Sequence, residues 1–230
     1  MACCHRCAAS EQFDFRVALK DLQRFRRRGP DPSTRQILAA IQKRASRTNA
    51  TLLDIGGGIG AIHHFMLEHG FERATHIDAS EAYLSTARDE AKRLGHSDRV
   101  QFQLAAFPDE AFSVEDADVV TLDRVVCCDP DYERLLRAAA SRARLFLVFS
   151  YPRARWVTRL FVALHNYTRR VIGRGFRSFV HPPAAMKAVL ENAGMRQTWG
   201  GRTWTWAVDL FERTPATPQA EGYFSPPTHA

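Results

Sequence analysis

Four glycines within five positions separate a compact apolar run from a second periodic stretch, in the segment Leu52–Ile62 (LLDIGGGIGAI). Gly56, Gly58 and Gly60 let a backbone turn tightly and approach a ligand closely, as glycine-rich nucleotide-binding turns do. Asp78 ends the next predicted strand, where a carboxylate can accept hydrogen bonds from the two hydroxyls of a ribose. The pattern therefore predicts a site for a nucleoside-containing ligand. A turn that needs glycine for geometry alone is the less favoured interpretation.

Asp54, two residues before the first glycine, separates two classes of ligand. Gly56, Gly58 and Ala61 also satisfy the G-x-G-x-x-A pattern of dinucleotide sites. A dinucleotide would place its pyrophosphate beside a carboxylate of the same sign, which is repulsive. S-adenosylmethionine has no phosphate and has a cationic amino group, so the acid favours it. An NAD-dependent oxidoreductase is an alternative that Asp54 disfavours.

An acid followed by G-x-G-x-G resembles motif I of the class I S-adenosylmethionine-dependent methyltransferases. The resemblance in motif order runs from about Leu52 to Phe149, and more loosely to Arg213. It implies a methyltransferase whose glycine loop lies under the methionine portion of the cofactor, with Asp78 at the ribose. It also implies a cofactor-binding set, which consists of Asp54, Gly56, Gly57, Gly58, Gly60, Asp78, Ala79, Ala106, Phe107, Asp123, Arg124 and Val125.

Two members of that set depart from the family pattern or have competing interpretations. The acid that the family places after strand three is missing, so we expect Phe107 to stack on the adenine, with Asp109 as an alternative contact. Asp123 either meets the cationic end of the cofactor or forms a local ion pair with Arg124.

In-line methyl transfer requires the acceptor and the methyl group to be close and aligned, and a neutral hydroxyl acceptor also needs a base. The candidate catalytic residues follow the fifth predicted strand and are His165, Tyr151 and His181. The ordinary pKa of a histidine suits proton removal near neutrality, although a structural histidine is the competing interpretation of His165. A carboxylate or thiol acceptor would need little or no base. His63 and His64 are adjacent and point to different helix faces, so we assign no metal site.

Five cysteines permit a second interpretation of the function. Cys127 and Cys128 follow the fourth predicted strand, and the others are Cys3, Cys4 and Cys7. Free cysteines are usually small buried hydrophobes, but five sulfurs around one site would suit a thiophilic metalloid as methyl acceptor. The low, odd count fits a reducing compartment better than a disulfide framework, and we expect a cytoplasmic protein.

The net charge of +7 has its source in two basic blocks. Residues 151–178 hold seven arginines and no acidic residue, and residues 16–47 hold ten basic residues against two acidic ones. Both blocks fall where the resembling family encloses its substrate, which favours a small, hydrophobic or anionic methyl acceptor. Trp156, Leu160, Phe161 and Leu164 give the block at 151–178 the pattern of a basic amphipathic helix, so peripheral membrane contact is an alternative to a core-facing helix. Nucleic acid is disfavoured because no binding module or RNA motif is recognisable, and the oligomeric state stays open.

Strands that alternate with helices predict an α/β fold with a parallel sheet between two helical layers. With the antiparallel final strand of the resembling family, the expected fold class is a Rossmann-like three-layer sandwich with a mostly parallel seven-stranded sheet, preceded by N-terminal helices. We expect a hairpin from residue 195 to 211 that turns at Gly200-Gly201. The expected segments are a flexible leader (1–10), N-terminal lid helices (11–49), a methyltransferase domain (50–213) with an insertion (151–181), and a disordered tail (214–230).

The 230 residues, 45% of them hydrophobic, suffice for one large domain. No apolar run approaches the roughly 18 residues of a membrane-spanning helix, and the N-terminus lacks the apolar core of a signal peptide. We therefore expect neither secretion nor membrane spanning. A non-catalytic adenosyl-ligand-binding or membrane-associated regulatory protein is the last functional alternative.

Overall fold

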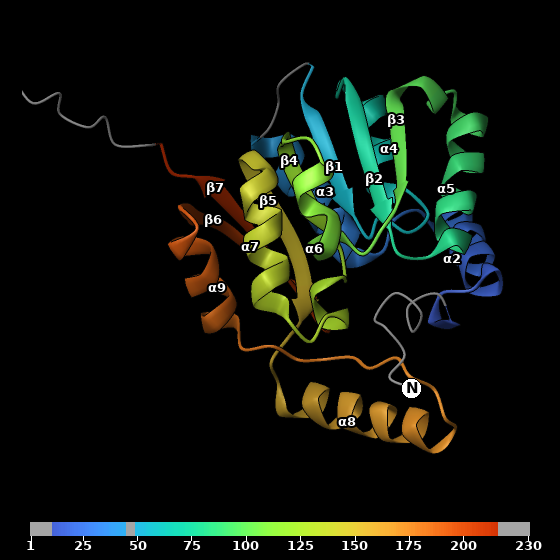
Figure 1. The fold of residues 1–230 in the computed structure, drawn as a ribbon, viewed down its shortest axis with the longest axis vertical. Helices are drawn as coiled ribbons and strands as arrows, with labels where there is room; N and C mark the ends of the chain where they lie inside the picture. Colours follow the sequence, from blue (N-terminus) through green and yellow to red (C-terminus); the bar gives the residue numbers. More distant parts are fainter. Residues whose placement is uncertain (1–10, 45–48, 216–230) are drawn as a thin grey trace, which may run out of the picture.

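The computed structural model describes residues 11–44 and 49–215, and a seven-stranded sheet runs through its centre in the order β3-β2-β1-β4-β5-β7-β6 (Figure 1). The first five strands are parallel, and β7 is antiparallel to both β5 and β6. This arrangement confirms the predicted Rossmann-like fold class. The strands are β1 (Thr51–Ile55), β2 (Arg73–Asp78), β3 (Val100–Leu104), β4 (Ala117–Leu122), β5 (Ala143–Pro152), β6 (Met195–Arg202) and β7 (Trp206–Arg213).

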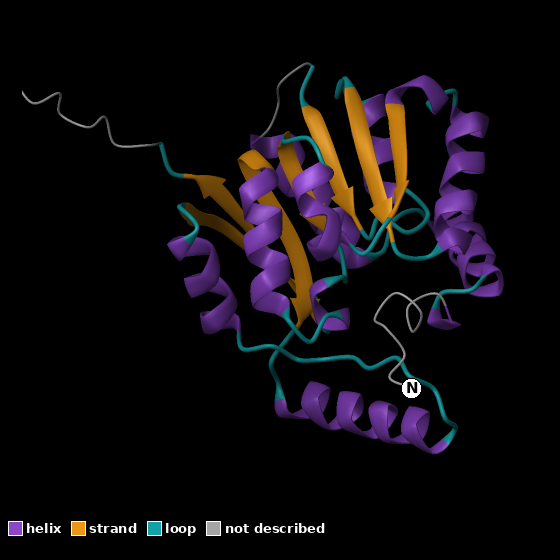
Figure 2. Ribbon diagram, in the orientation of Figure 1, coloured by secondary structure: helices purple, strands orange, loops and turns teal. Residues whose placement is uncertain are grey.

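Helices cover both faces of the sheet (Figure 2). The α-helices are α2 (Phe15–Arg28), α3 (Pro32–Arg44), α4 (Ala61–Glu68), α5 (Glu81–Leu94), α6 (Phe107–Glu110), α7 (Tyr132–Arg142), α8 (Trp156–Val171) and α9 (Pro183–Asn192). Single 3₁₀ turns are η1 (Ser97–Arg99), η2 (Ala111–Ser113) and η3 (Val126–Cys128). Among the described helices, none combines the length and hydrophobicity needed to span a bilayer.

The period of two along each strand divides the core into two layers. Leu53 and Val120 face α6, α7 and α9, whereas their neighbours Leu52 and Val119 face α3 and α4. The middle strands are buried on both sides, as parallel strands usually are. The sheet is therefore a rigid platform, and the loops at the carboxyl ends of its parallel strands are positioned by it.

Local capping chemistry sets several helix boundaries. Ser80 accepts a hydrogen bond from the Tyr83 backbone N–H and starts α5, and Gly95 ends it with a φ of 73°. A serine before a helix and a glycine after it are the usual sequence signals of such boundaries. Residues 11 and 12 are helical, and after a break α2 begins at Phe15, where the Asp14 carboxylate accepts from the Val17 N–H and caps the helix.

The C-terminal hairpin turns three residues later than predicted. Gly200 and Gly201 lie within β6, where they pair with Asp209 and Val208 of β7. The turn is closed instead by Thr203, whose backbone N–H donates to the Trp206 carbonyl over 2.7 Å. Glycine was read as a turn signal, but here it allows the close approach of neighbouring side chains inside a ladder.

Helix α8 lies apart from both helical layers. In Figure 1 it lies below the carboxyl ends of the parallel strands, and the chain returns from it across the molecule to α9. It belongs to the predicted insertion, and its position places it next to the ligand-binding edge expected for this fold.

Candidate functional site

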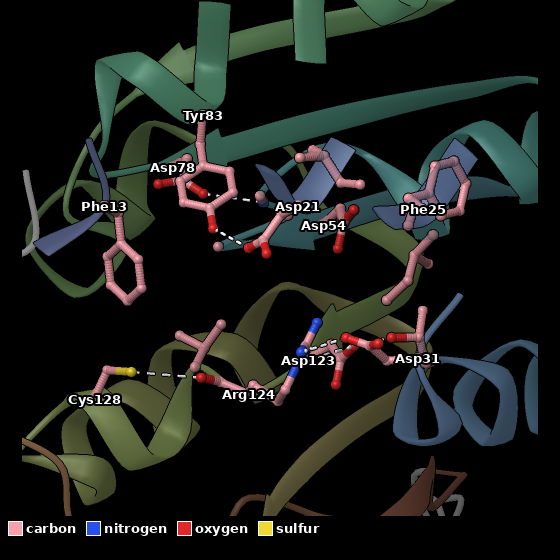
Figure 3. Close-up of a pocket in the computed structure, with 18 of the residues that line it drawn as sticks. Phe13, Asp21, Phe25, Asp31, Asp54, Asp78, Tyr83, Asp123, Arg124 and Cys128 are labelled. Carbon is pink, nitrogen blue, oxygen red and sulfur yellow. Dashed lines mark hydrogen bonds and ion pairs between the residues drawn. The ribbon is translucent and has the colours of Figure 1, made fainter. Parts of the chain in front are cut away.

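A cavity of about 400 Å³ opens at the carboxyl ends of β1, β2 and β4 (Figure 3). Its floor is the glycine loop after β1 and the loops after β2 and β4, and its roof is α2, the turn to α3 and the segment after α8. A cavity of this size suits a small-molecule ligand. Nine of the twelve expected cofactor-binding residues line it, namely Asp54, Gly56, Gly57, Gly58, Asp78, Ala79, Asp123, Arg124 and Val125.

A Cβ would come within 3.0 Å of a neighbouring side chain at three positions of the glycine loop, which are Gly56, Gly57 and Gly60. A Cβ on Gly56 would lie 2.5 Å from a Val125 methyl group, and a Cβ on Gly57 would lie 2.7 Å from the Asp54 carboxylate. Gly56 and Gly58 also have φ values of 61° and 57°, in the left-handed region that favours glycine. The loop is therefore a shallow backbone cradle, which fits the close approach of a nucleoside cofactor.

Asp78 presents a carboxylate to the cavity at the end of β2. One oxygen accepts from the Gly58 N–H over 3.0 Å and the other accepts from the Ser80 N–H over 2.8 Å. Burial raises the pKa of Asp78 to about 6. Since each carboxylate oxygen has a second acceptor position, Asp78 can still accept hydrogen bonds from a vicinal diol such as that of a ribose.

Asp54 lies behind the glycine loop and has partners of its own. It is 1% exposed, it accepts from the Thr121 hydroxyl over 2.8 Å, and its other oxygen lies 3.2 Å from Nδ1 of His63. Burial raises its pKa. A direct contact with a cationic amino group therefore stays a prediction, and it would have to compete with these two hydrogen bonds.

Four buried histidines form a cluster on the α4 side of the sheet, and one of them, His63, contacts that carboxylate. Nδ1 of His76 lies 3.3 Å from Nδ1 of His63, and Nδ1 of His64 lies 3.3 Å from Nδ1 of His96. Burial lowers the pKa of His63 and His76 to about 3 and that of His64 to about 2. These imidazoles are therefore neutral at physiological pH, and they support the glycine loop without charge.

The donor chemistry of this histidine cluster does not favour a metal ion. A histidine that binds a metal through Nδ1 normally donates its Nε2–H to an acceptor. Within the described part of the chain, Nε2 of His63 and Nε2 of His76 have no hydrogen-bond partner. The arrangement therefore fits a cluster of imidazoles without a metal better than a metal-binding site.

The loop after β4 is held by hydroxyl groups and by the roof. Both oxygens of Asp123 accept hydrogen bonds of 2.5 Å, one from Ser150 and one from Thr34. Arg124 donates over 2.7 Å to Asp31, and its Nε lies 3.7 Å from Asp123. The stronger partner of Arg124 is therefore in the α2–α3 turn.

Arg124 also has a φ of 62°, which is costly for a residue with a side chain. The Ser150 hydroxyl accepts from its backbone N–H over 2.8 Å and holds that conformation. Strain of this kind is common at ligand-binding loops.

The roof contains residues that were not predicted from the sequence to belong to the site. The Tyr83 hydroxyl donates over 2.5 Å to Asp21 of α2, and Asp31 accepts from Arg24 as well as from Arg124. Phe13 packs edge-on against Tyr83 with ring centroids 5.7 Å apart. A tyrosine three residues after the Ser80 cap was the available signal, because that position faces the first turn of α5 and the adjoining loop.

Three expected cofactor contacts lie outside the cavity wall. Phe107 is 3% exposed and packs in the core with Val126 and Leu135, so the expected stacking on adenine is not supported by its position. Phe107 is the first residue of α6 and its ring is buried there, so the ring does not reach a ligand in the cavity. Ala106 and Gly60 flank helix starts away from the wall. The alternative contact Asp109 is exposed and forms an ion pair of 2.8 Å with Arg134.

The three candidate catalytic residues also lie outside the cavity wall. Tyr151 donates over 2.7 Å to Asp209, and Nε2 of His181 lies 2.9 Å from the Asp129 carbonyl. His165 lies on α8, with its Nε2 3.3 Å from Nε of Arg169. The expectation that these side chains face a methyl acceptor is therefore not supported by their positions.

The two described cysteines do line the cavity. Their sulfur atoms lie 3.8 Å apart, and both thiols donate to the Arg124 carbonyl over 3.4 Å. The hydrogen bond with Cys127, together with burial, raises the pKa of Cys128 well above its ordinary value, so this thiol is protonated. Cys3, Cys4 and Cys7 lie outside the described residues.

Comparison with known proteins gives one family. Residues 52–144 match the family model described as a methyltransferase domain. A search of curated proteins found no match.

Solved structures with this fold are numerous, and three illustrate their range. A magnesium protoporphyrin IX methyltransferase from Synechocystis PCC 6803 with bound S-adenosylmethionine is 16% identical, with a TM-score of 0.69 over 93% of this chain and 99% of that one. The 1,6-didemethyltoxoflavin-N1-methyltransferase of Burkholderia thailandensis is 18% identical, with a TM-score of 0.65 over 93% and 92%. A Haloferax volcanii methyltransferase in complex with the activator Trm112 is 14% identical, with a TM-score of 0.68 over 92% and 100%. At these identities the likeness establishes the fold.

Proposed function

Since this chain contains a class I S-adenosylmethionine-dependent methyltransferase domain, we propose that it transfers the methyl group of S-adenosylmethionine to a small anionic acceptor bound in the cavity described above. The observation that carries this proposal is the convergence of the backbone cradle and the Asp78 carboxylate on one cavity. When bound, the cofactor supplies an electrophilic methyl group. The chain binds, orients and shields the reactants.

Each part of the cavity has a role in that function. Gly56 and Gly58 leave room for the cofactor to lie on the backbone, and Asp78 is the acceptor for its ribose hydroxyls. The ion pair between Arg124 and Asp31 and the hydrogen bond between Tyr83 and Asp21 hold the roof over the cavity. Such enclosure excludes water and keeps the reacting groups aligned.

Arg169 favours an anionic acceptor. It lies in the cavity wall, it is 9% exposed, and its Nη1 has no hydrogen-bond partner among the described residues. Its side chain contacts His165 and the face of Phe176, and neither of these groups is acidic. A buried cation without an anion is costly, so a carboxylate or similar group on the acceptor would complete the site. Such an acceptor oxygen needs little or no general base.

Calorimetry with S-adenosylmethionine tests the cofactor part of the proposal. We expect saturable binding to the intact protein and at least about tenfold weaker binding to Asp78→Asn, because the amide cannot accept from both hydroxyls. Asp109→Asn is the matched control, since that carboxyl group is exposed and outside the cavity. Equal affinity of the two variants would remove the ribose assignment.

Methyl-labelled cofactor incubated with a cell extract tests the acceptor part. We expect labelled small molecules, and we expect Arg169→Gln to lose most of that labelling while keeping its affinity for the cofactor. Arg170→Gln is the control, because Arg170 is exposed on the same helix. Labelling of protein or nucleic acid instead, or full activity of Arg169→Gln, would contradict an anionic small acceptor.

A thiophilic acceptor is the second candidate, because both Cys127 and Cys128 line the cavity. The raised pKa of Cys128 speaks against a thiolate ligand at neutral pH. A Cys127→Ser/Cys128→Ser variant with unchanged activity toward metalloid oxyanions would eliminate this candidate.

A further inference from the structure

Helix α8 turns its apolar face toward solvent. Six large side chains on it are between 61% and 75% exposed, namely Trp156, Leu160, Phe161, Leu164, Tyr167 and Val171. At about 100° per residue they fall within an arc of about 140° on the helix. Exposed apolar surface on this scale marks an interaction site more often than it marks ordinary surface.

The opposite face of α8 is polar and packs against the rest of the protein. Asn166 makes two hydrogen bonds with the backbone of Ser178, of 2.8 and 3.0 Å. Arg169 is buried against Phe176, with its guanidinium 5.2 Å from the ring centroid. Both side chains lie about 150° from the centre of the apolar arc. The helix is thus anchored through its polar side, and its apolar side is left without a described partner.

Positive charge lies along one edge of the apolar face and at the start of the helix. Residues 151–178 contain seven arginines and no acidic residue. Arg159 and Arg170 lie about 40 to 60° from one edge of the apolar arc. At the start of the helix Arg155 stacks on Trp204, with its guanidinium 4.8 Å from the ring centroid, and Trp204 is 79% exposed. The turn between β6 and β7 thereby extends the same basic, aromatic surface.

We propose that the apolar face of α8 and Trp204 dock onto an anionic lipid bilayer, with α8 lying in the plane of the interface. An apolar arc with tryptophan, phenylalanine and leucine beside arginines is the composition of interfacial helices. The arginines neutralise acidic headgroups, and their aliphatic parts reach along the acyl boundary. This inference concerns binding alone and does not depend on the proposed methyl transfer.

Charge argues against a second copy of this chain as the occupant. Two copies that met through α8 would bring two acid-free arginine blocks together, and like charges across an interface are repulsive. A nucleic acid would satisfy the arginines but would leave the apolar arc in water. An anionic bilayer satisfies both parts of the surface.

Vesicle flotation of the full chain tests the proposal. Vesicles of phosphatidylcholine with 30% phosphatidylglycerol should bind at least about tenfold more protein than phosphatidylcholine alone, and raising NaCl from 0.1 to 0.5 M should reverse most of that difference. Leu160→Ser/Leu164→Ser should lower binding at least about tenfold. Phe112→Ser is the matched control, because Phe112 is 80% exposed but lies in η2.

Each other outcome overturns the proposal. Equal binding to the two kinds of vesicle, or Leu160→Ser/Leu164→Ser binding like the wild type, would show that α8 is not the membrane contact. If sedimentation shows a dimer that this double variant abolishes while vesicles bind neither protein, the occupant is a second copy. Because the substituted side chains are exposed, the variants should fold, and circular dichroism checks this.

Discussion

Acidification should destabilise this protein from about pH 6.5 downward. His63, His64 and His76 are neutral in the fold because burial lowers their pKa to between about 2 and about 3. In the unfolded chain a histidine takes up a proton near pH 6.5. The unfolded state therefore binds more protons below that pH, and stability falls from about pH 6.5 downward toward the folded pKa values.

The size of the effect follows from linkage. At pH 5 each of the three histidines costs about 2 kcal/mol relative to pH 8, and this figure changes little for any folded pKa below about 4. Together they cost about 6 kcal/mol, which is comparable to the whole stability of an ordinary domain. Asp78 acts in the opposite sense, because its pKa is raised to about 6, and it offsets about 1 kcal/mol at pH 5.

Urea unfolding followed by tryptophan fluorescence, between pH 8 and pH 5, measures this directly. The slope of the unfolding free energy against pH should correspond to an uptake of two to three protons near pH 5.5. His76→Gln should lower that uptake by about one proton. The charged groups around the cluster are Asp54, Arg88 and Glu90, and the linkage assumes that they keep their charge states in this range.

A free energy of unfolding at pH 5 within about 1 kcal/mol of its value at pH 7.5 would refute this reasoning. So would an unchanged slope in His76→Gln. Either result would mean that the imidazoles bind protons in the folded state, through water or through a rearranged loop.

The remaining predictions concern the cradle and the roof. Gly57→Ala should lose about 1 to 3 kcal/mol in urea unfolding, because the added methyl group would overlap the Asp54 carboxylate; unaltered stability would mean that the loop can shift. Glu90→Gln should lose about 1 to 2 kcal/mol and lower Tm by several degrees, since a fully buried carboxylate there binds two arginines and holds α2 on α5; a Tm equal to that of Asp89→Asn would show that the pairs contribute nothing. Asp31→Asn removes the partner of two arginines, so proteolytic cleavage within α2 should become faster and cofactor affinity should fall severalfold; an unchanged cleavage rate would show that the roof does not depend on this contact.

Local signals in the sequence predicted most of the fold. The caps of α5 can be recognised in the sequence because a serine before a helix and a glycine after it act within a few residues. The hairpin turn was misplaced because glycines inside a ladder and glycines in a turn look the same in sequence. What decides between them is the packing of the strand opposite.

The functional site also has some features that local sequence signals predict and others that they do not. The glycine loop and Asp78 were found because a strand, a turn and a helix follow each other directly in the chain. The contact of Arg124 with Asp31 joins residues 93 positions apart, and no spacing rule predicts such a pair. Phe107 follows β3, where the sequence predicts a contact with the adenine. In the structure its side chain packs in the hydrophobic core instead.

The position of β7 has a consequence for synthesis. It pairs with β5 on one side and β6 on the other, yet it follows both in the chain and is the last of the described strands. Until residues 206–213 are available, β5 has one edge without hydrogen-bond partners, and that strand is rich in buried apolar residues such as Leu147 and Phe149. An unpaired apolar edge is a template for association between chains. A stalled or shortened nascent chain should therefore be a target for chaperones, and the yield of folded protein should depend on how quickly this last strand is delivered.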